Sequence, residues 1–115
     1  MVVTTTTDRE DRALALANSI VREGYAACVQ ILPARSIYRW KGRIEDSKEF
    51  LLIAKTRKAL AGKLSDFIRA NHSYELPEIT VMQITGGLKA YLGWISDETK
   101  PIRAPIRGGR RTAKK

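Results

Sequence analysis

The order of strand-like and helix-like hydrophobic patterns constrains the fold of this chain more than any other feature. A β-branched segment occupies residues 2–6, and an apolar stripe at helical spacing follows it up to about Glu23. Further along, the patterns are strand-like at residues 26–32, 37–44 and 50–54, helical from about 56 to 71, strand-like at 79–84, and helical at 88–95. The order is therefore β-α-β-β-α-β with an extra helix at the end.

This order predicts an α+β fold, a ferredoxin-like βαββαβ sandwich with a long β-hairpin and an extra C-terminal helix. Each βαβ unit has a right-handed crossover, and two interleaved units give one antiparallel sheet with helices on one face. Pro33 interrupts the second strand-like run, and residues 45–48 are expected to form a turn before the apolar run 50–54. We expect these runs to form the hairpin.

The face of the sheet that the helices leave uncovered needs another cover. The strand around Leu52 is apolar on both faces, and Tyr38 and Trp40 are large side chains to leave in water. The simplest cover is another subunit, with the hairpin adding strands to a neighbour's sheet.

Composition limits the class and the location of the protein. The chain has 115 residues, the length of one domain, and 43% of them are hydrophobic, which rules out wholesale disorder. No stretch approaches the roughly 20 apolar residues of a membrane span, and no apolar segment follows Met1, so we expect a cytoplasmic protein. A single cysteine excludes an internal disulfide and a cysteine-rich zinc site.

The net charge of +9 lies mostly at the C-terminal end. Residues 100–115 hold seven basic residues and no acidic one, whereas residues 1–99 carry a net charge of +2. We therefore expect a domain at 1–99 and a basic, disordered tail at 100–115. The tail is either a solubilising extension or a weak, salt-sensitive contact with nucleic acid or an anionic surface.

Three residues are candidates for metal ligands. A Cys28 thiolate suits Cu(I), although a cysteine in an apolar run is more often a small buried hydrophobe. His72 is the only histidine; it is either a helix-end residue or a ligand for copper or zinc, with the nearby Glu75 as a carboxylate helper.

A second group combines a cation, carboxylates and aromatic side chains on elements that the fold brings toward a cleft between subunits. Such a group either binds a small molecule or anchors the interface. Its members are Tyr38, Trp40, Lys55, Tyr74, Glu78, Tyr91 and Trp94. No phosphate-binding loop or catalytic triad is predicted by spacing, so we expect no enzyme activity.

Several separate motifs resemble one known family, in order and in spacing over residues 2–96. They lie at residues 26–33 (AACVQILP), 36–42 (SIYRWKG), 55–56 (KT), 72–78 (HSYELPE) and 91–95 (YLGWI). In these segments the chain is similar to the CutA divalent-ion tolerance proteins. The resemblance implies the ferredoxin-like fold and a tight homotrimer like the PII-type signal proteins, with the hairpin at the interface.

The resemblance also implies a function: binding and tolerance of divalent metal ions, chiefly copper, without catalysis. The bound metal would be copper, as Cu(II) or Cu(I), or a different metal that is divalent. Folding would require no metal. Members that are thought to bind copper tend to have a cysteine at the position of Thr5 and paired histidines at Asn71 and His72, and only His72 is present here. The alternative function is that of a PII-like trimer that senses a small molecule in the intersubunit cleft.

Overall fold

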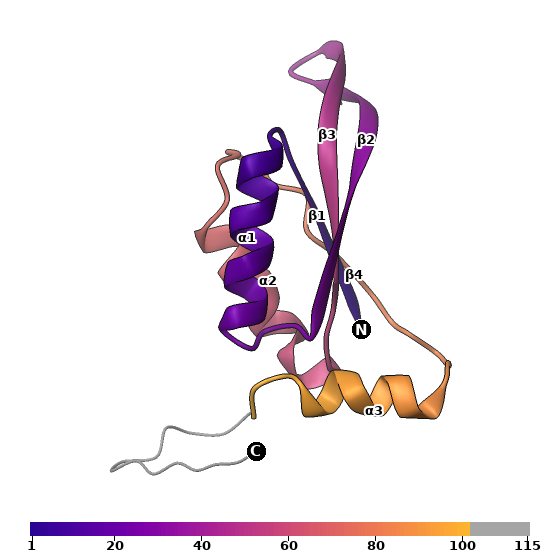
Figure 1. The fold of residues 1–115 in the computed structure, drawn as a ribbon. Coiled ribbons are helices and arrows are strands. Elements are labelled where there is room, and N and C mark those ends of the chain that lie inside the picture. The colour runs from indigo at the N-terminus through magenta and orange to yellow at the C-terminus, as the bar shows by residue number, and fades with distance from the viewer. Residues whose placement is uncertain (102–115) are drawn as a thin grey trace.

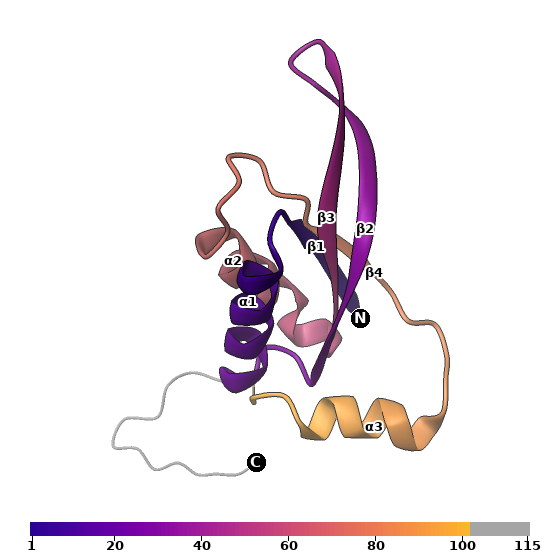
Figure 2. The same ribbon diagram turned by 45° about the horizontal axis from the view of Figure 1, so that its top comes forward.

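The computed structural model describes residues 1–101 and has the predicted order of elements (Figures 1 and 2). A short 3-10 turn, Lys58–Leu60, leads into the second helix. The elements are β1 (Val2–Thr7), α1 (Glu10–Arg22), β2 (Cys28–Trp40), β3 (Arg43–Lys55), α2 (Ala61–Ala70), β4 (Thr80–Met82) and α3 (Lys89–Asp97).

The strands form one four-stranded sheet with the order β2-β3-β1-β4, and every neighbouring pair is antiparallel. Helices α1 and α2 lie together on one face of this sheet, and α3 crosses beyond its lower end (Figure 1). The predicted ferredoxin-like α+β fold is therefore confirmed. β4 is shorter than the predicted strand 79–84 and pairs only with residues 2–4 of β1.

The core lies between the sheet and the two helices α1 and α2. Val3 and Leu52 point from the sheet toward Ile20 of α1 and Leu64 of α2, and each of these side chains is at most 1% exposed. Ile20 and Leu64 belong to the apolar stripes that the sequence predicts at helical spacing, and the strand register shows that Val3 and Leu52 are on the face of the sheet toward them.

The hairpin turn begins four residues before the first residue of the predicted turn. Lys41 and Gly42 make the turn with φ angles of +50° and +79°, as a two-residue hairpin turn requires, and residues 45–48 are part of β3. The predicted turn at 45–48 was therefore wrong. Pro33 also does not interrupt β2, because β2 is an edge strand and needs hydrogen-bond donors on one side only.

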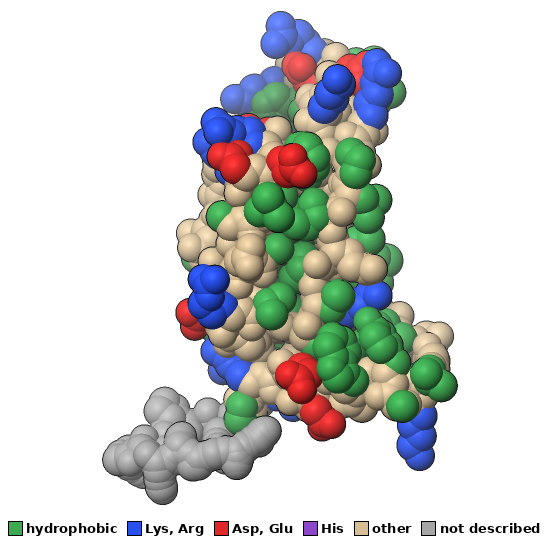
Figure 3. Space-filling view, in the orientation of Figure 1, with side chains coloured by type: hydrophobic (Ala, Val, Ile, Leu, Met, Phe, Trp, Pro, Cys, Tyr) green, Lys and Arg blue, Asp and Glu red, His purple; other side chains and the backbone are tan. Residues whose placement is uncertain are grey.

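The face of the sheet opposite α1 and α2 is largely uncovered. The strand register places Leu32 and Met82 on this open face, with exposed fractions of 41% and 52%, beside the half-buried Val2, Leu51 and Ile53. Hydrophobic side chains gather along the strands and again over α3 (Figure 3). This apolar surface agrees with the expectation that another subunit covers the face.

The described chain continues past the predicted domain boundary at residue 99. The backbone N–H of Lys100 donates to the carbonyl of Gly24 at 2.8 Å, and its ammonium group lies 3.9 Å from the centre of the Tyr25 ring. From residue 102 onward, the predicted tail lies outside the described residues. Among residues 1–101, no helix is both long enough and apolar enough to cross a membrane.

Candidate functional site

A cleft of about 810 Å³ lies on the open face of the sheet, between the β2–β3 hairpin and the loop 73–78. The hairpin contributes Tyr38, Trp40 and Glu49, and the loop contributes Tyr74 and Glu78. These two segments are brought together because β1 pairs with β3 on one side and with β4, which follows the loop, on the other. The cleft is lined by Thr6, Asp8, Ser36, Ile37, Tyr38, Trp40, Ser47, Lys48, Glu49, Tyr74, Glu75, Leu76, Pro77 and Glu78.

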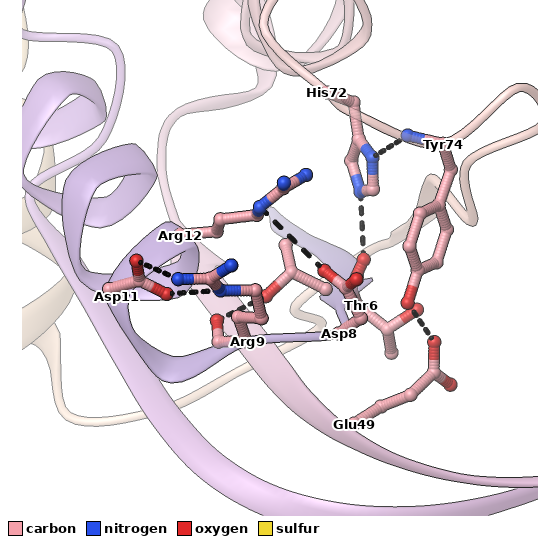
Figure 4. Close-up of polar contacts among 9 residues, drawn as sticks. Thr6, Asp8, Arg9, Asp11, Arg12, Glu49, His72 and Tyr74 are labelled. Carbon is pink, nitrogen blue, oxygen red and sulfur yellow. Dashed lines mark hydrogen bonds and ion pairs between the residues drawn. The ribbon is translucent and has the colours of Figure 1, made fainter.

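A buried carboxylate lies in the wall of this cleft. Glu49 is only 7% exposed, and its Oε2 accepts a hydrogen bond of 2.7 Å from the Tyr74 hydroxyl (Figure 4). Burial, this hydrogen bond and the negative charge of Glu49 raise the pKa of Tyr74 well above its ordinary value. Tyr74 therefore keeps its proton and continues to donate this hydrogen bond to the Glu49 carboxylate.

The mouth of the cleft carries further negative charge. Asp8, Glu75 and Glu78 add three carboxylates to Glu49, and Lys48 is the one basic side chain that residues 1–101 contribute to the lining. Asp8 is partly compensated by Arg12, whose Nε lies 4.0 Å away (Figure 4). The electrostatic environment of the cleft therefore favours cations.

Both ring nitrogens of His72 are already engaged. The backbone N–H of Tyr74 donates to Nδ1 at 3.0 Å, so Nδ1 carries no proton, and Nε2–H donates to the carbonyl of Thr6 at 2.7 Å (Figure 4). These bonds tie the loop to β1 beyond residue 4, where pairing with β4 has ended. To bind a metal ion, His72 must give up one of these two bonds.

The three predicted metal ligands are not brought together within one protomer. Cys28 is half-buried at the start of β2, level with Val2 of β1, whereas His72 bonds to Thr6. Four residues of strand, about 13 Å along the strand direction, and the width of β3 therefore separate Cys28 from the carbonyl that His72 contacts. Glu75 lines the cleft, but His72 faces a different hollow beside α1. Among residues 1–101, no three histidine, cysteine or acidic side chains form a cluster that could hold a metal ion.

The seven residues predicted for the intersubunit cleft divide into two groups. Four of them, Tyr38, Trp40, Tyr74 and Glu78, line the cleft described above. The other three lie at the far end of the open face, where the Lys55 ammonium group lies 5.5 Å from the Tyr91 ring, which stacks on Trp94 at 5.5 Å. Within one protomer these are two separate groups, and a cleft between subunits that would join them stays a prediction.

Sequence reasoning missed Glu49, the most buried acidic side chain in the lining of the cleft. The turn that was expected at residues 45–48 would place Glu49 at the end of a strand, whereas Glu49 lies in the middle of β3. A signal was present: Ser47 and Glu49 continue, at period two, the face of β3 that carries Leu51 and Ile53.

The structure defines a small ferredoxin-like domain, and comparison with known proteins identifies its family. The model of the family described as "CutA1 divalent ion tolerance protein" matches residues 1–98. The chain belongs to this family, as the resemblance of its motifs predicted.

Relatives agree with this assignment. The chain is 43% identical over 101 residues to a protein of Arabidopsis thaliana named "Protein CutA, chloroplastic", covering 87% of this chain and 56% of that protein. The chain thus spans little more than half the length of this relative.

Two solved structures share the fold. One is a "Divalent cation tolerance protein" of Thermus thermophilus, with 39% identity, a TM-score of 0.82, and coverage of 86% of this chain and 97% of that chain. The other is the "PII-like protein CutA" of Nostoc, with 30% identity, a TM-score of 0.82, and coverage of 86% and 96%.

Proposed function

We propose that this protein works as a homotrimer in the tolerance of divalent metal ions, copper foremost, by binding the ion and not by catalysis. The observation that carries the proposal is the family match over residues 1–98, together with relatives named for divalent-cation tolerance. A cytosolic location remains a prediction, which cell fractionation would test.

The uncovered face of the sheet supports the assembly. An apolar surface that includes Leu32 and Met82 costs free energy in water, and burying it in a subunit interface removes that cost. The hairpin extends well beyond the rest of the sheet (Figures 1 and 2), so it can reach a neighbouring subunit.

Copper titration tests the metal proposal. We expect Cu(II) to bind the full chain through His72, which must then give up one of its two hydrogen bonds, and Cu(I) to involve the Cys28 thiolate. The variant His72→Ala should weaken Cu(II) binding, whereas Ser73→Ala, in the same exposed loop, should not. Unchanged affinity in His72→Ala would remove His72 from the site.

A second candidate function is that of a PII-like trimer that binds a small molecule. The observation that favours it is the cleft itself: its volume suits a small ligand, and aromatic and polar side chains alternate along its walls. Thermal unfolding in the presence of candidate metabolites tests it, because a ligand that binds only the folded protein raises the melting temperature.

A further inference from the structure

We propose that the basic tail, residues 100–115, binds the phosphate backbone of nucleic acid without reading its sequence, and that two basic side chains of the folded domain beside the start of the tail extend this binding surface. The family model ends at residue 98, so membership of the family does not account for these residues. The inference goes beyond the proposed function and depends neither on copper binding nor on the trimer.

The first argument is the separation of charge along the chain. Residues 100–115 hold seven basic residues and no acidic one, whereas residues 1–99 carry a net charge of +2. A block of like charges has no neighbouring acidic residues to neutralise it, so a polyanion is its natural partner. The counterions that the polyanion releases are the main source of sequence-independent affinity for nucleic acid.

The second argument is the place where the tail begins. The backbone N–H of Lys100 donates to the carbonyl of Gly24, just after α1, and Nε of Arg57 donates to the hydroxyl of Thr99 at 3.0 Å. Tyr25, whose ring faces the Lys100 ammonium group, packs against the core between the sheet and the helices α1 and α2. The tail therefore starts on the helix-covered side of the domain, and the open face that the proposed trimer covers lies on the other side.

The third argument is the pair of basic side chains beside this starting point. Arg22 ends α1, and Lys58 directly follows Arg57; Arg22 and Lys58 are exposed, and neither forms an ion pair within residues 1–101. Glu23 and Glu98 lie equally close to the start of the tail, so this part of the domain is nearly neutral by itself. The tail supplies the net positive charge, and the two basic side chains add to it.

The composition of the tail favours nucleic acid over a membrane. Four of the six basic residues from position 102 onward are arginines, whose planar guanidinium groups bind phosphate oxygens in a bidentate way. A peripheral membrane segment needs an apolar face or a lipid anchor in addition to charge. Prolines at positions 101 and 105 and glycines at 108 and 109 interrupt any helical stripe, and residues 102–115 contain no aromatic residue and no cysteine.

The number of charges sets the expected salt dependence. The segment 102–115 spans at most about 50 Å, and duplex DNA carries one negative charge per roughly 1.7 Å of its axis, so all six basic side chains can contact phosphates. Six contacts give a slope of about −5 for the logarithm of the binding constant against the logarithm of the salt concentration. Binding should therefore weaken about a thousandfold between roughly 50 and 200 mM salt.

Fluorescence anisotropy of the full chain with a labelled duplex DNA of about 20 base pairs tests the proposal. We expect binding in the micromolar range at about 50 mM salt, with the slope given above. A variant that combines four substitutions should bind at least about tenfold more weakly, with a slope of about −2, because two basic residues remain after position 101. The four are Arg103→Gln, Arg107→Gln, Arg110→Gln and Arg111→Gln.

Two double variants with equal loss of charge test the contribution of the folded domain. Arg22→Gln with Lys58→Gln should reduce the size of the slope by about one to two, because these charges lie beside the start of the tail. Arg12→Gln with Arg69→Gln, near the other ends of α1 and α2, is the matched control and should leave the slope unchanged. Circular dichroism establishes that each variant is folded.

Three results would overturn the proposal: no binding of DNA at about 50 mM salt, wild-type binding by the fourfold variant, or equal changes of slope in the two double variants. The last result would mean that net charge alone governs binding. Binding to phosphatidylserine vesicles at about 150 mM salt without any binding to DNA would also contradict the proposal, and would indicate a membrane partner.

Discussion

Removal of one hydroxyl group tests the central feature of the cleft, the pair of Tyr74 and Glu49. The Tyr74 hydroxyl donates a hydrogen bond of 2.7 Å to the Glu49 carboxylate, which is 7% exposed. Tyr74→Phe leaves this carboxylate buried without that hydrogen bond, so we expect the free energy of unfolding to fall by about 1–3 kcal/mol.

Urea unfolding at one fixed protein concentration is the assay, since the proposed subunit assembly would make apparent stability depend on concentration. Tyr38→Phe is the matched control: its hydroxyl pairs with Ser47 at 3.2 Å in an exposed position, and its loss should change the free energy of unfolding by less than about 0.5 kcal/mol.

A double-mutant cycle isolates the interaction. Replacing both partners, with Glu49→Leu in the Tyr74→Phe background, removes the unsatisfied carboxylate, so the double variant should lose about 1 kcal/mol less than the sum of the two single losses. If the losses simply add, or if Tyr74→Phe costs no more than Tyr38→Phe, the hydrogen bond is not stabilising and the reasoning fails.

Three further predictions concern pH, packing and backbone conformation. Above pH 10 an unfolded tyrosine ionises, whereas the raised pKa keeps folded Tyr74 protonated, so unfolding releases a proton. The stability of the wild type should therefore fall more steeply with rising pH than the stability of Tyr74→Phe. Urea unfolding between pH 9 and about 11 would measure this difference. Leu64→Ala, at a fully buried position, should cost about 2–5 kcal/mol in chemical unfolding. Gly24→Ala should cost about 1–2 kcal/mol in the same assay, because φ is +78° there and the new Cβ would lie 3.0 Å from the Cβ of Lys100; an unchanged midpoint would contradict this.

Most of the fold follows from periodicity in the sequence. The helical stripes of α1 and α2 and the strand-like runs between them predict the order of elements that the structure has. The turn could not be placed in this way. Lys41 and Gly42 fit the alternation of the residues on either side of them, so the pattern gave no sign of a turn there. Residues 45–48 have the polar side chains that are typical of a turn, although they lie in β3.

The candidate site was harder to predict, because it depends on which face and which level of the sheet each residue occupies. Tyr38, Trp40 and Tyr74 line one cleft within the protomer, because the topology brings their segments together. Lys55 shares the open face with them but lies at the far end of β3, next to Tyr91. Spacing along the chain does not reveal this separation; only the strand register does.

The central claim is that copies of this chain cover the open, apolar face of the sheet. Sedimentation equilibrium at low micromolar concentration tests it most directly, with circular dichroism to establish that the protein is folded. The account predicts a particle of three times the 12.9 kDa chain mass. A stable, folded species of one chain mass would contradict it.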